Sequence, residues 1–166
     1  MWKTLAIHFG RYPSQARVAK LMLEYGLRVK EGRIYCGEIE LADVAVGKAA
    51  SVDRRIVRSA VETIEAVPEL KAVYSKLHPA ALFNDVAPVM GWGTIEIIPD
   101  NAQSLGIVAD VTTVVTSAGL AIRQVNVGDP DLTAEPRLYL ITERPVPAEL
   151  IPRLKACRGV KSILIH

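Results

Sequence analysis

A short run of backbone-breaking residues near the middle of the chain, from Pro88 to Gly93, separates two parts with different hydrophobic patterns. The run reads Pro-Val-Met-Gly-Trp-Gly and contains one proline and two glycines. Such clusters interrupt helices and strands, because proline lacks an amide donor and glycine is conformationally free. Before the run, apolar residues mostly recur at helical spacing, whereas strand-like and helical segments alternate after it. We therefore predict an α+β protein with two domains, residues 1–91 and 92–166.

The composition is that of a globular protein with enough apolar material for a core, since 50% of the 166 residues are hydrophobic and 23% are charged. No apolar run approaches the ~20 residues of a membrane span, and the first residues lack a signal-peptide pattern. Cys36 and Cys157 have no Cys or His at zinc-ligand spacing and form no disulfide framework. We expect a cytoplasmic protein that uses no membrane, metal or cofactor.

The first domain is predicted to be mainly helical. Apolar residues fall at helical spacing in three stretches, and the second stretch stops at Gly26, a residue type that commonly follows a helix. The stretches are residues 2–9, 14–25 and 70–77. Between them, residues 28–41 change to a strand-like pattern with Gly32 and Gly37 at turns, which predicts a small β-hairpin or a wing.

Residues 44–61 have the pattern of two short helices that cross at a steep angle. Helices can cross closely only where their side chains are small, and the first helix carries three small residues. They are Gly47, Ala49 and Ala50. Asp53 is placed to cap the second helix, and Val57 and Val61 then face inward, one helical turn apart. These features predict a helix-turn-helix.

The second helix of this pair leaves a basic face exposed. In a DNA-binding helix-turn-helix, early residues of the second helix enter the major groove, where arginine contacts phosphates or guanine edges. The predicted DNA-binding residues are Arg54, Arg55, Arg58 and Ser59. Residues 1–92 hold 13 Lys and Arg against 10 Asp and Glu, a weakly basic balance. The alternative is a core helix pair whose arginines are solvated or paired with Glu62 and Glu65.

Residues 94–166 are predicted to follow the order β-α-β-β-α-β, a ferredoxin-like layout. The expected strands are residues 94–98, 121–127, 137–142 and 160–165. One helix is expected over residues 107–118, closed by Gly119. The other is expected to begin near Glu149, because Pro152 is tolerated only within the first helical turn.

This second part resembles an ACT domain, a small module named for enzymes of amino-acid metabolism. The resemblance covers residues 94–166 and rests on four short segments. They are Asp100-Asn101, Gly106-Ile107-Val108-Ala109-Asp110-Val111, Gly119-Leu120-Ala121-Ile122 and Gly159-Val160-Lys161-Ser162-Ile163. The whole chain, including Val52-Asp53-Arg54-Arg55 and Tyr35-Cys36-Gly37, resembles a family of archaeal proteins described as predicted regulators of amino-acid metabolism. The resemblance implies a homodimer with one eight-stranded sheet, and a small ligand, often an amino acid, near the loop after the first strand.

The residues of that loop agree with a ligand site. Gly106 allows a backbone to approach a ligand closely, and the free N–H groups at the following helix start favour a carboxylate. Asp100 is suited to an ammonium group, and Asn101 can bond either end of an amino acid. The predicted ligand-binding residues are Asp100, Asn101, Gln103, Ser104, Gly106 and Ile107. The alternative is a polar surface loop with no ligand.

No group of residues has the spacing of a catalytic site, because the three histidines are scattered and no nucleotide-binding glycine motif is present. We therefore expect a regulator and not an enzyme. The leading hypothesis is a homodimer that senses an amino acid through its ACT domains and binds double-stranded DNA through the helix after Asp53. The alternative hypothesis is a regulator that binds no DNA and acts through a partner enzyme or another protein.

Overall fold

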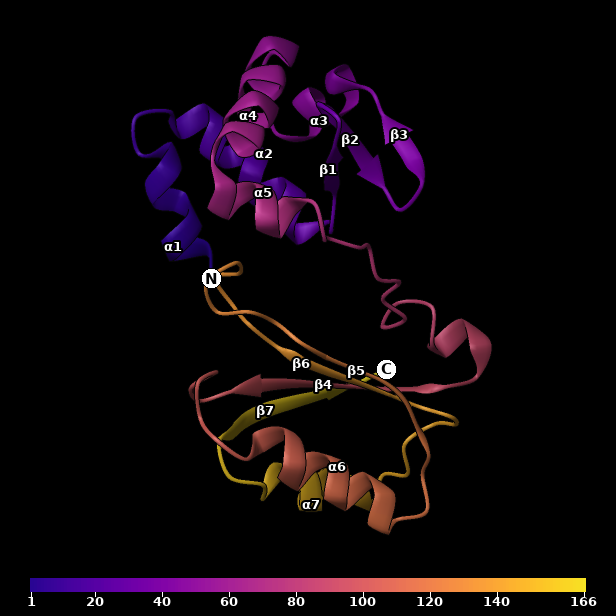
Figure 1. The fold of residues 1–166 in the computed structure, drawn as a ribbon. Helices are drawn as coiled ribbons and strands as arrows, with labels where there is room; N and C mark the ends of the chain where they lie inside the picture. Colours follow the sequence, from indigo (N-terminus) through magenta and orange to yellow (C-terminus); the bar gives the residue numbers. More distant parts are fainter. The chain divides into compact units, whose positions relative to one another are not determined.

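The computed structural model describes all residues from Met1 to His166, and the chain forms two compact units, Met1–Ala81 and Leu82–His166 (Figure 1). It contains seven α-helices and two antiparallel sheets, so the predicted α+β class is confirmed. None of the helices has the length and apolar character needed to span a membrane.

The first unit combines five α-helices with a short 3-10 helix and a three-stranded sheet. In chain order these are α1 (Trp2–Ala6), the 3-10 helix Ile7–Phe9, α2 (Pro13–Glu24), β1 (Arg28–Lys30), β2 (Arg33–Cys36), β3 (Ile39–Leu41), α3 (Asp43–Ala49), α4 (Arg54–Ala66) and α5 (Pro68–Tyr74). The sheet has the order β1-β2-β3 with antiparallel neighbours, so residues 28–41 form two consecutive hairpins where the sequence predicted one.

The end of α2 is fixed by a glycine that no other residue can replace without strain. Gly26 follows the helix with a φ of +62°, and a Cβ atom there would lie 2.3 Å from the carbonyl oxygen of His78. The predicted stop at Gly26 is therefore confirmed. The helix begins at Pro13, whose missing amide donor costs nothing in the first turn.

The core of the first unit is apolar, with one buried hydroxyl that is satisfied. Its fully buried large side chains include Phe9, Met22, Ile34, Ile64, Leu70 and Tyr74. The Tyr74 hydroxyl donates a hydrogen bond to the carbonyl of Ala19 at 2.9 Å. Burial raises the pKa of Tyr74, so this hydroxyl remains a donor throughout the ordinary pH range.

Helices α3 and α4 meet at a point where there is no space for a side chain. Gly47 is buried, and a Cβ atom on it would lie 2.9 Å from the carbonyl oxygen of Val52 and 3.4 Å from a methyl of Val57. Ala50 is also buried, whereas Ala49 is exposed, so the prediction that Ala49 lies at the crossing is wrong. Its position on the outer side of α3 points it to solvent.

The second unit is a four-stranded antiparallel sheet with two helices on one face (Figure 1). Its elements are the 3-10 helix Pro88–Met90, β4 (Gly93–Pro99), α6 (Ile107–Ser117), β5 (Ile122–Val127), β6 (Leu138–Thr142), α7 (Leu150–Lys155) and β7 (Val160–Ile165). From β4 onward they follow the order β-α-β-β-α-β, and the strands lie in the order β5-β6-β4-β7. Helix α7 begins after Glu149, with Pro152 in its first turn.

Residues 82–92 pack on the sheet of the second unit. The amide of Phe83 donates to the side-chain oxygen of Gln124 at 3.0 Å, and the Thr94 hydroxyl donates to the carbonyl of Asn84 at 3.1 Å. The Phe83 ring also meets Trp92 edge-on, with ring centroids 6.0 Å apart. The division of the chain therefore falls after Ala81, whereas the sequence placed the boundary near Gly91.

We expect Gly47→Val to destabilise the first unit by about 2 kcal/mol, because the new side chain must push apart two packed helices. Ala49→Val adds the same side chain to an exposed position of the same helix and should change stability by less than about 0.5 kcal/mol. Urea unfolding followed by circular dichroism measures both. Equal stability of the two variants would contradict the close approach of α3 and α4 at Gly47.

Candidate functional site

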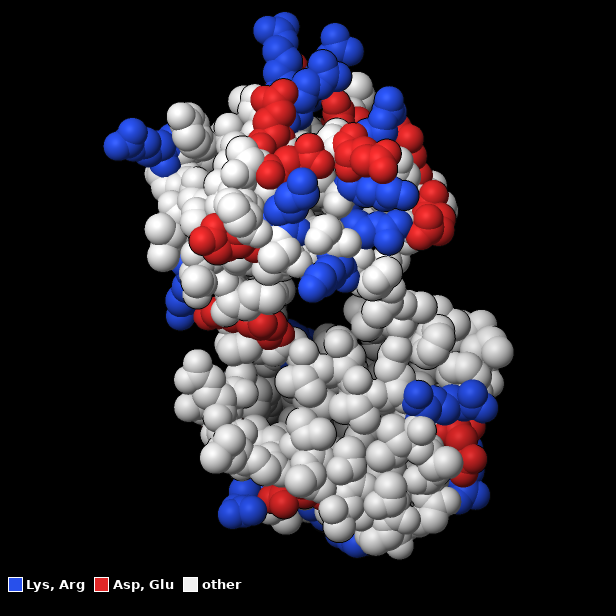
Figure 2. Space-filling model, in the orientation of Figure 1, with Lys and Arg blue, Asp and Glu red and all other residues white.

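The first two turns of α4 present a cluster of cations to solvent. Asp53 caps the helix, because its carboxylate accepts a hydrogen bond from the amide of Arg55 at 2.8 Å. The arginines that follow, Arg54, Arg55 and Arg58, are all exposed. Together with Ser59 and Glu62 they line a shallow hollow of about 460 Å³, which we call the α4 arginine surface. Lys and Arg side chains gather over α4 at the top of Figure 2, with acidic side chains close beside them.

The arginines of this surface are only loosely held by neighbouring carboxylates. Arg58 lies 3.4 Å from Asp43, and Arg55 lies 3.7 Å from Asp53. Arg54 is exposed at the first position of the helix. The side chains of Arg55 and Arg58 are 89% and 73% exposed, so these pairs are easily exchanged with water or another anion.

Glu62 and Glu65, which the sequence offered as partners of these arginines, do not pair with them. Glu65 accepts a hydrogen bond from the amide of Gly32 at 2.9 Å. The closest carboxylates to the arginines are those of Asp43 and Asp53. The cations of the α4 arginine surface therefore remain accessible to a ligand.

A second candidate site lies in the second unit, where the loop after β4 meets α6 and the neighbouring strands. A small hollow there, which we call the loop hollow, is lined by Pro99, Ala102, Ser104, Ile107, Val108, Val127, Gly128, Pro136, Arg137 and Leu138. Two of the six predicted ligand-binding residues, Ser104 and Ile107, line it. The other four, Asp100, Asn101, Gln103 and Gly106, are exposed in the loop and do not line it.

The exposed loop residues have local structural roles. The side-chain oxygen of Asn101 accepts a hydrogen bond from the amide of Gln103 at 2.9 Å, which forms a turn. Gly106 is the residue before α6 and has a φ of +92°. Because glycine has no side chain, no side-chain hydrogen bond caps the amides at the start of this helix. The charged residue of the loop, Asp100, is exposed to water, where it contributes little to holding a ligand.

Arg158 is a cation near the start of α6 that the sequence did not indicate. Its guanidinium lies 3.7 Å from the position that a Cβ atom of Gly106 would occupy, and it pairs with Asp110 at 3.3 Å. A basic residue after a short helix is too common to attract notice in a sequence. The start of α6 thus combines uncapped amides with a nearby positive charge.

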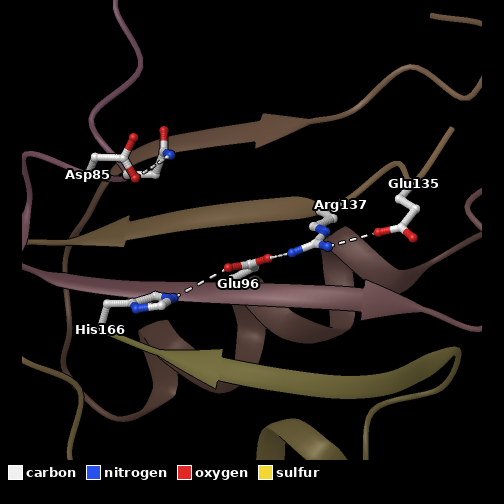
Figure 3. A network of polar contacts seen from close by, with 6 residues as sticks. Asp85, Glu96, Glu135, Arg137 and His166 are labelled. Carbon is white, nitrogen blue, oxygen red and sulfur yellow. Dashed lines mark hydrogen bonds and ion pairs between the residues drawn. The ribbon is translucent and has the colours of Figure 1, made fainter. Parts of the chain in front are cut away.

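The most buried charge of the chain is a carboxylate in the middle of β4 (Figure 3). Glu96 is 7% exposed and alternates with Ile95 and Ile97, which point into the core under the helices. Its two oxygens are bound by different partners. One accepts from the guanidinium of Arg137, and the other lies 3.3 Å from Nε2 of His166.

These contacts control the charge of Glu96. Burial acts to raise its pKa, but the hydrogen bonds from Arg137 and His166 outweigh burial and hold the pKa below its ordinary value. Arg137 also pairs with Glu135 at 2.9 Å. Since both oxygens of Glu96 are occupied, we assign this network a structural role, in which it joins the residue before β6 and the residue after β7 to β4.

The structure contains no group of three or more His, Cys, Asp or Glu side chains arranged to hold a metal ion. Both cysteines are free thiols and partly buried. Burial, with a smaller contribution from Asp110, raises the pKa of the Cys157 thiol, which disfavours its nucleophilic thiolate form.

We expect Glu96→Gln to lower the free energy of unfolding by about 2 kcal/mol at neutral pH, because Arg137 and His166 lose the buried charge to which they are bound. The folded-state pKa of Glu96 is depressed, so its contribution is present above about pH 4.3 and is lost as the pH falls through the folded-state value. The pH dependence of the melting temperature should therefore be flatter in the variant at acid pH.

Glu135→Gln is the matched control, since it removes an exposed carboxylate from the same arginine. It should change stability by less than about 0.5 kcal/mol. A larger loss in Glu135→Gln than in Glu96→Gln would show that the network does not depend on the buried carboxylate.

Comparisons with known proteins add no relative from which a function could be transferred. No family model matches the chain, and no curated protein matches its sequence. The function is therefore inferred from the residues of the chain and from the surfaces that they form.

Proposed function

We propose that this chain is a metabolite-responsive regulator that acts by binding and not by catalysis. Its first unit is a helix-turn-helix domain that binds double-stranded DNA, and its second unit is an ACT domain that dimerises and binds a small ligand, an amino acid. The observation that carries the proposal is the capped N-terminal end of α4, whose first two turns carry three exposed arginines. The resemblance to archaeal regulators of amino-acid metabolism supports the same combination of domains.

The DNA-binding part of the proposal rests on the geometry of α3 and α4. Gly47 allows the two helices to cross closely, and Asp53 starts α4 immediately after the turn. The α4 arginine surface is then the outermost part of the pair, as entry into a major groove requires. The first unit holds 13 Lys and Arg against 9 Asp and Glu, which gives a net charge of +4 that attracts phosphates.

We assign no DNA contact to the sheet of β1, β2 and β3, although the sequence offered residues 28–41 as a wing. Its arginine side chains are occupied by acidic residues of the same segment, because Arg33 pairs with Glu40 and Arg28 pairs with Glu38. A sheet whose charges are balanced in this way has little attraction for a phosphate backbone. DNA contact is therefore proposed for α4 alone.

The dimer part of the proposal rests on one flank of α6. Asp110 and Ser117 bind Arg158 and Arg153, which mark the side of α6 that faces α7. The opposite flank is formed by Val108, Thr112 and Thr116, and we call it the α6 flank. A broad uncharged area is visible on the second unit in Figure 2.

Removing the α6 flank from water costs little free energy, because its hydroxyl groups are already hydrogen-bonded within the helix. The Thr112 hydroxyl donates to the carbonyl of Val108 at 2.7 Å, and the Thr116 hydroxyl donates to the carbonyl of Thr112 at 2.8 Å. These threonines therefore present methyl groups outward. Strand β5 bonds only to β6 and leaves its other edge open. A second copy fits this surface best, because an uncharged face can meet itself across a two-fold axis without repulsion.

The ligand-binding part of the proposal places a small molecule at the loop hollow. The uncapped amides at the start of α6 and the nearby guanidinium of Arg158 favour the carboxylate of an amino acid. A ligand changes the arrangement of the dimer only to the extent that it binds one arrangement more tightly. An amino acid that binds one arrangement of the dimer more tightly would in this way control DNA binding.

One observation favours the alternative, a regulator that acts through a partner protein. The first unit has an open groove of about 270 Å³ with an almost entirely apolar lining. It is formed by Leu21, Tyr25, Leu27, Cys36, Leu41, Ala45, Val46 and Ala49. Exposed apolar grooves commonly bind other proteins.

We expect the triple substitution of Arg54, Arg55 and Arg58 by alanine to weaken binding to duplex DNA by at least about 100-fold at low salt. The slope of log affinity against log salt should fall by about 0.9 for each phosphate contact removed. Fluorescence anisotropy of a labelled duplex, titrated at several salt concentrations, measures both quantities.

The matched control replaces Lys30, Lys71 and Lys76 by alanine, which removes the same charge from exposed positions of the same unit. Its affinity for DNA should fall much less. Similar losses in the two triple variants would contradict the assignment to α4, and the absence of any DNA binding would favour the partner-protein alternative.

We expect Thr112→Glu combined with Thr116→Glu to convert the proposed dimer into monomers, because four carboxylates would meet across the two-fold axis. Glutamate is a good helix former, so α6 should remain folded. Light scattering after size-exclusion chromatography measures the mass. Ala148→Glu combined with Ala156→Glu adds the same charge to exposed positions around α7 and should leave the dimer intact.

A further inference from the structure

The loop hollow is lined almost entirely by hydrocarbon. Seven of its ten lining residues have side chains without a polar atom: Pro99, Ala102, Ile107, Val108, Val127, Pro136 and Leu138. Ser104 contributes the single hydroxyl. Arg137 also lines the hollow, but its guanidinium is engaged by Glu96 and Glu135. A charged or amide side chain placed here would therefore lose water without gaining a partner.

The size of the hollow limits what can enter it. The volume open to the centre of a water-sized sphere is about 50 Å³. One water-sized group needs roughly 10–15 Å³ by this measure, so about three to five such groups fit. A side chain of three or four carbon atoms fills this space. An aromatic ring exceeds this volume, and a single methyl group leaves most of it empty.

The depth of the hollow is fixed because its floor belongs to the core of the second unit. Ile107 is 7% exposed and Leu138 is 4% exposed. Ile107 also packs closely against Gly159, where a Cβ atom would lie only 3.0 Å from its side chain. Deepening the hollow would therefore require repacking the core, which is unfavourable.

We infer that the effector is an amino acid with an aliphatic side chain of three or four carbon atoms, the size of valine, leucine or isoleucine, and that this side chain occupies the loop hollow. The inference rests on the proposed function, which places a small ligand at this loop. It adds the chemical class of the ligand and the surface that selects it.

The test measures the melting temperature of the full chain with L-valine, L-leucine and L-isoleucine, and with L-alanine, L-phenylalanine, L-lysine and L-aspartate for comparison. A ligand that binds the folded state raises the melting temperature as its concentration increases. We expect at least one of the three aliphatic amino acids to raise it by about 5 °C at about 100 times its dissociation constant. The four comparison amino acids should have little effect.

Val127→Phe locates the binding surface, because a ring at this exposed position on the wall of the hollow covers the hollow without entering the core. It should abolish the shift produced by the aliphatic amino acids. Leu164→Phe is the matched control, since Leu164 lies on the other edge strand with similar exposure and does not line the hollow. This variant should keep the shift.

The outcomes separate the inference from the proposed function. A shift with phenylalanine, lysine or aspartate but with none of the three aliphatic amino acids would overturn the inference and leave amino-acid sensing in place. A shift that survives Val127→Phe would overturn the location of the site. No shift with any amino acid would overturn the sensing role and the inference together.

Discussion

The carboxylate of Glu96 lies at the centre of the second unit's sheet, shielded from water, with Arg137 on one side and His166 on the other. An isolated charge at this depth would be strongly unfavourable, so the strand can carry it only while both partners are present. The neighbouring side chains on β4, those of Ile95 and Ile97, pack under the two helices. Strand β4 therefore contributes to the core on one face of the sheet and to the ion network on the other face. It pairs with β6 on one side and with β7 on the other.

Most of the secondary structure could be predicted from local patterns. The stop of α2 at Gly26, the capping of α4 by Asp53 and the start of α7 near Glu149 all follow from residues within one helical turn of the boundary. The third strand of the first sheet was missed because β1, β2 and β3 are only three or four residues long, too short to establish a period. The packing of residues 82–92 depends on distant partners such as Gln124, which no local pattern contains.

The candidate sites were predictable only in part, for the same physical reason. The arginines of α4 are contiguous in sequence, and their exposure follows from the helical period. The loop hollow takes its lining from segments that lie far apart in the chain, and of the six predicted ligand-binding residues only Ser104 and Ile107 belong to it. The partners of Glu96 are distant in the chain, because Arg137 lies 41 positions and His166 lies 70 positions after it. Their approach to Glu96 depends on the order of the strands in the sheet.

The two edges of the second sheet are unlike, and this difference bears on how large an assembly can grow. If β5 meets a second copy, the joined sheet still ends on both sides in β7, whose outer edge is also unpaired. β7 carries an exposed lysine, Lys161, and its pairing with β4 is interrupted by an irregularity between Ile98 and Pro99. Charge and irregular pairing both discourage the addition of further strands. These features of β7 oppose open-ended growth of the sheet, so the proposed pairing through β5 would stop at two copies.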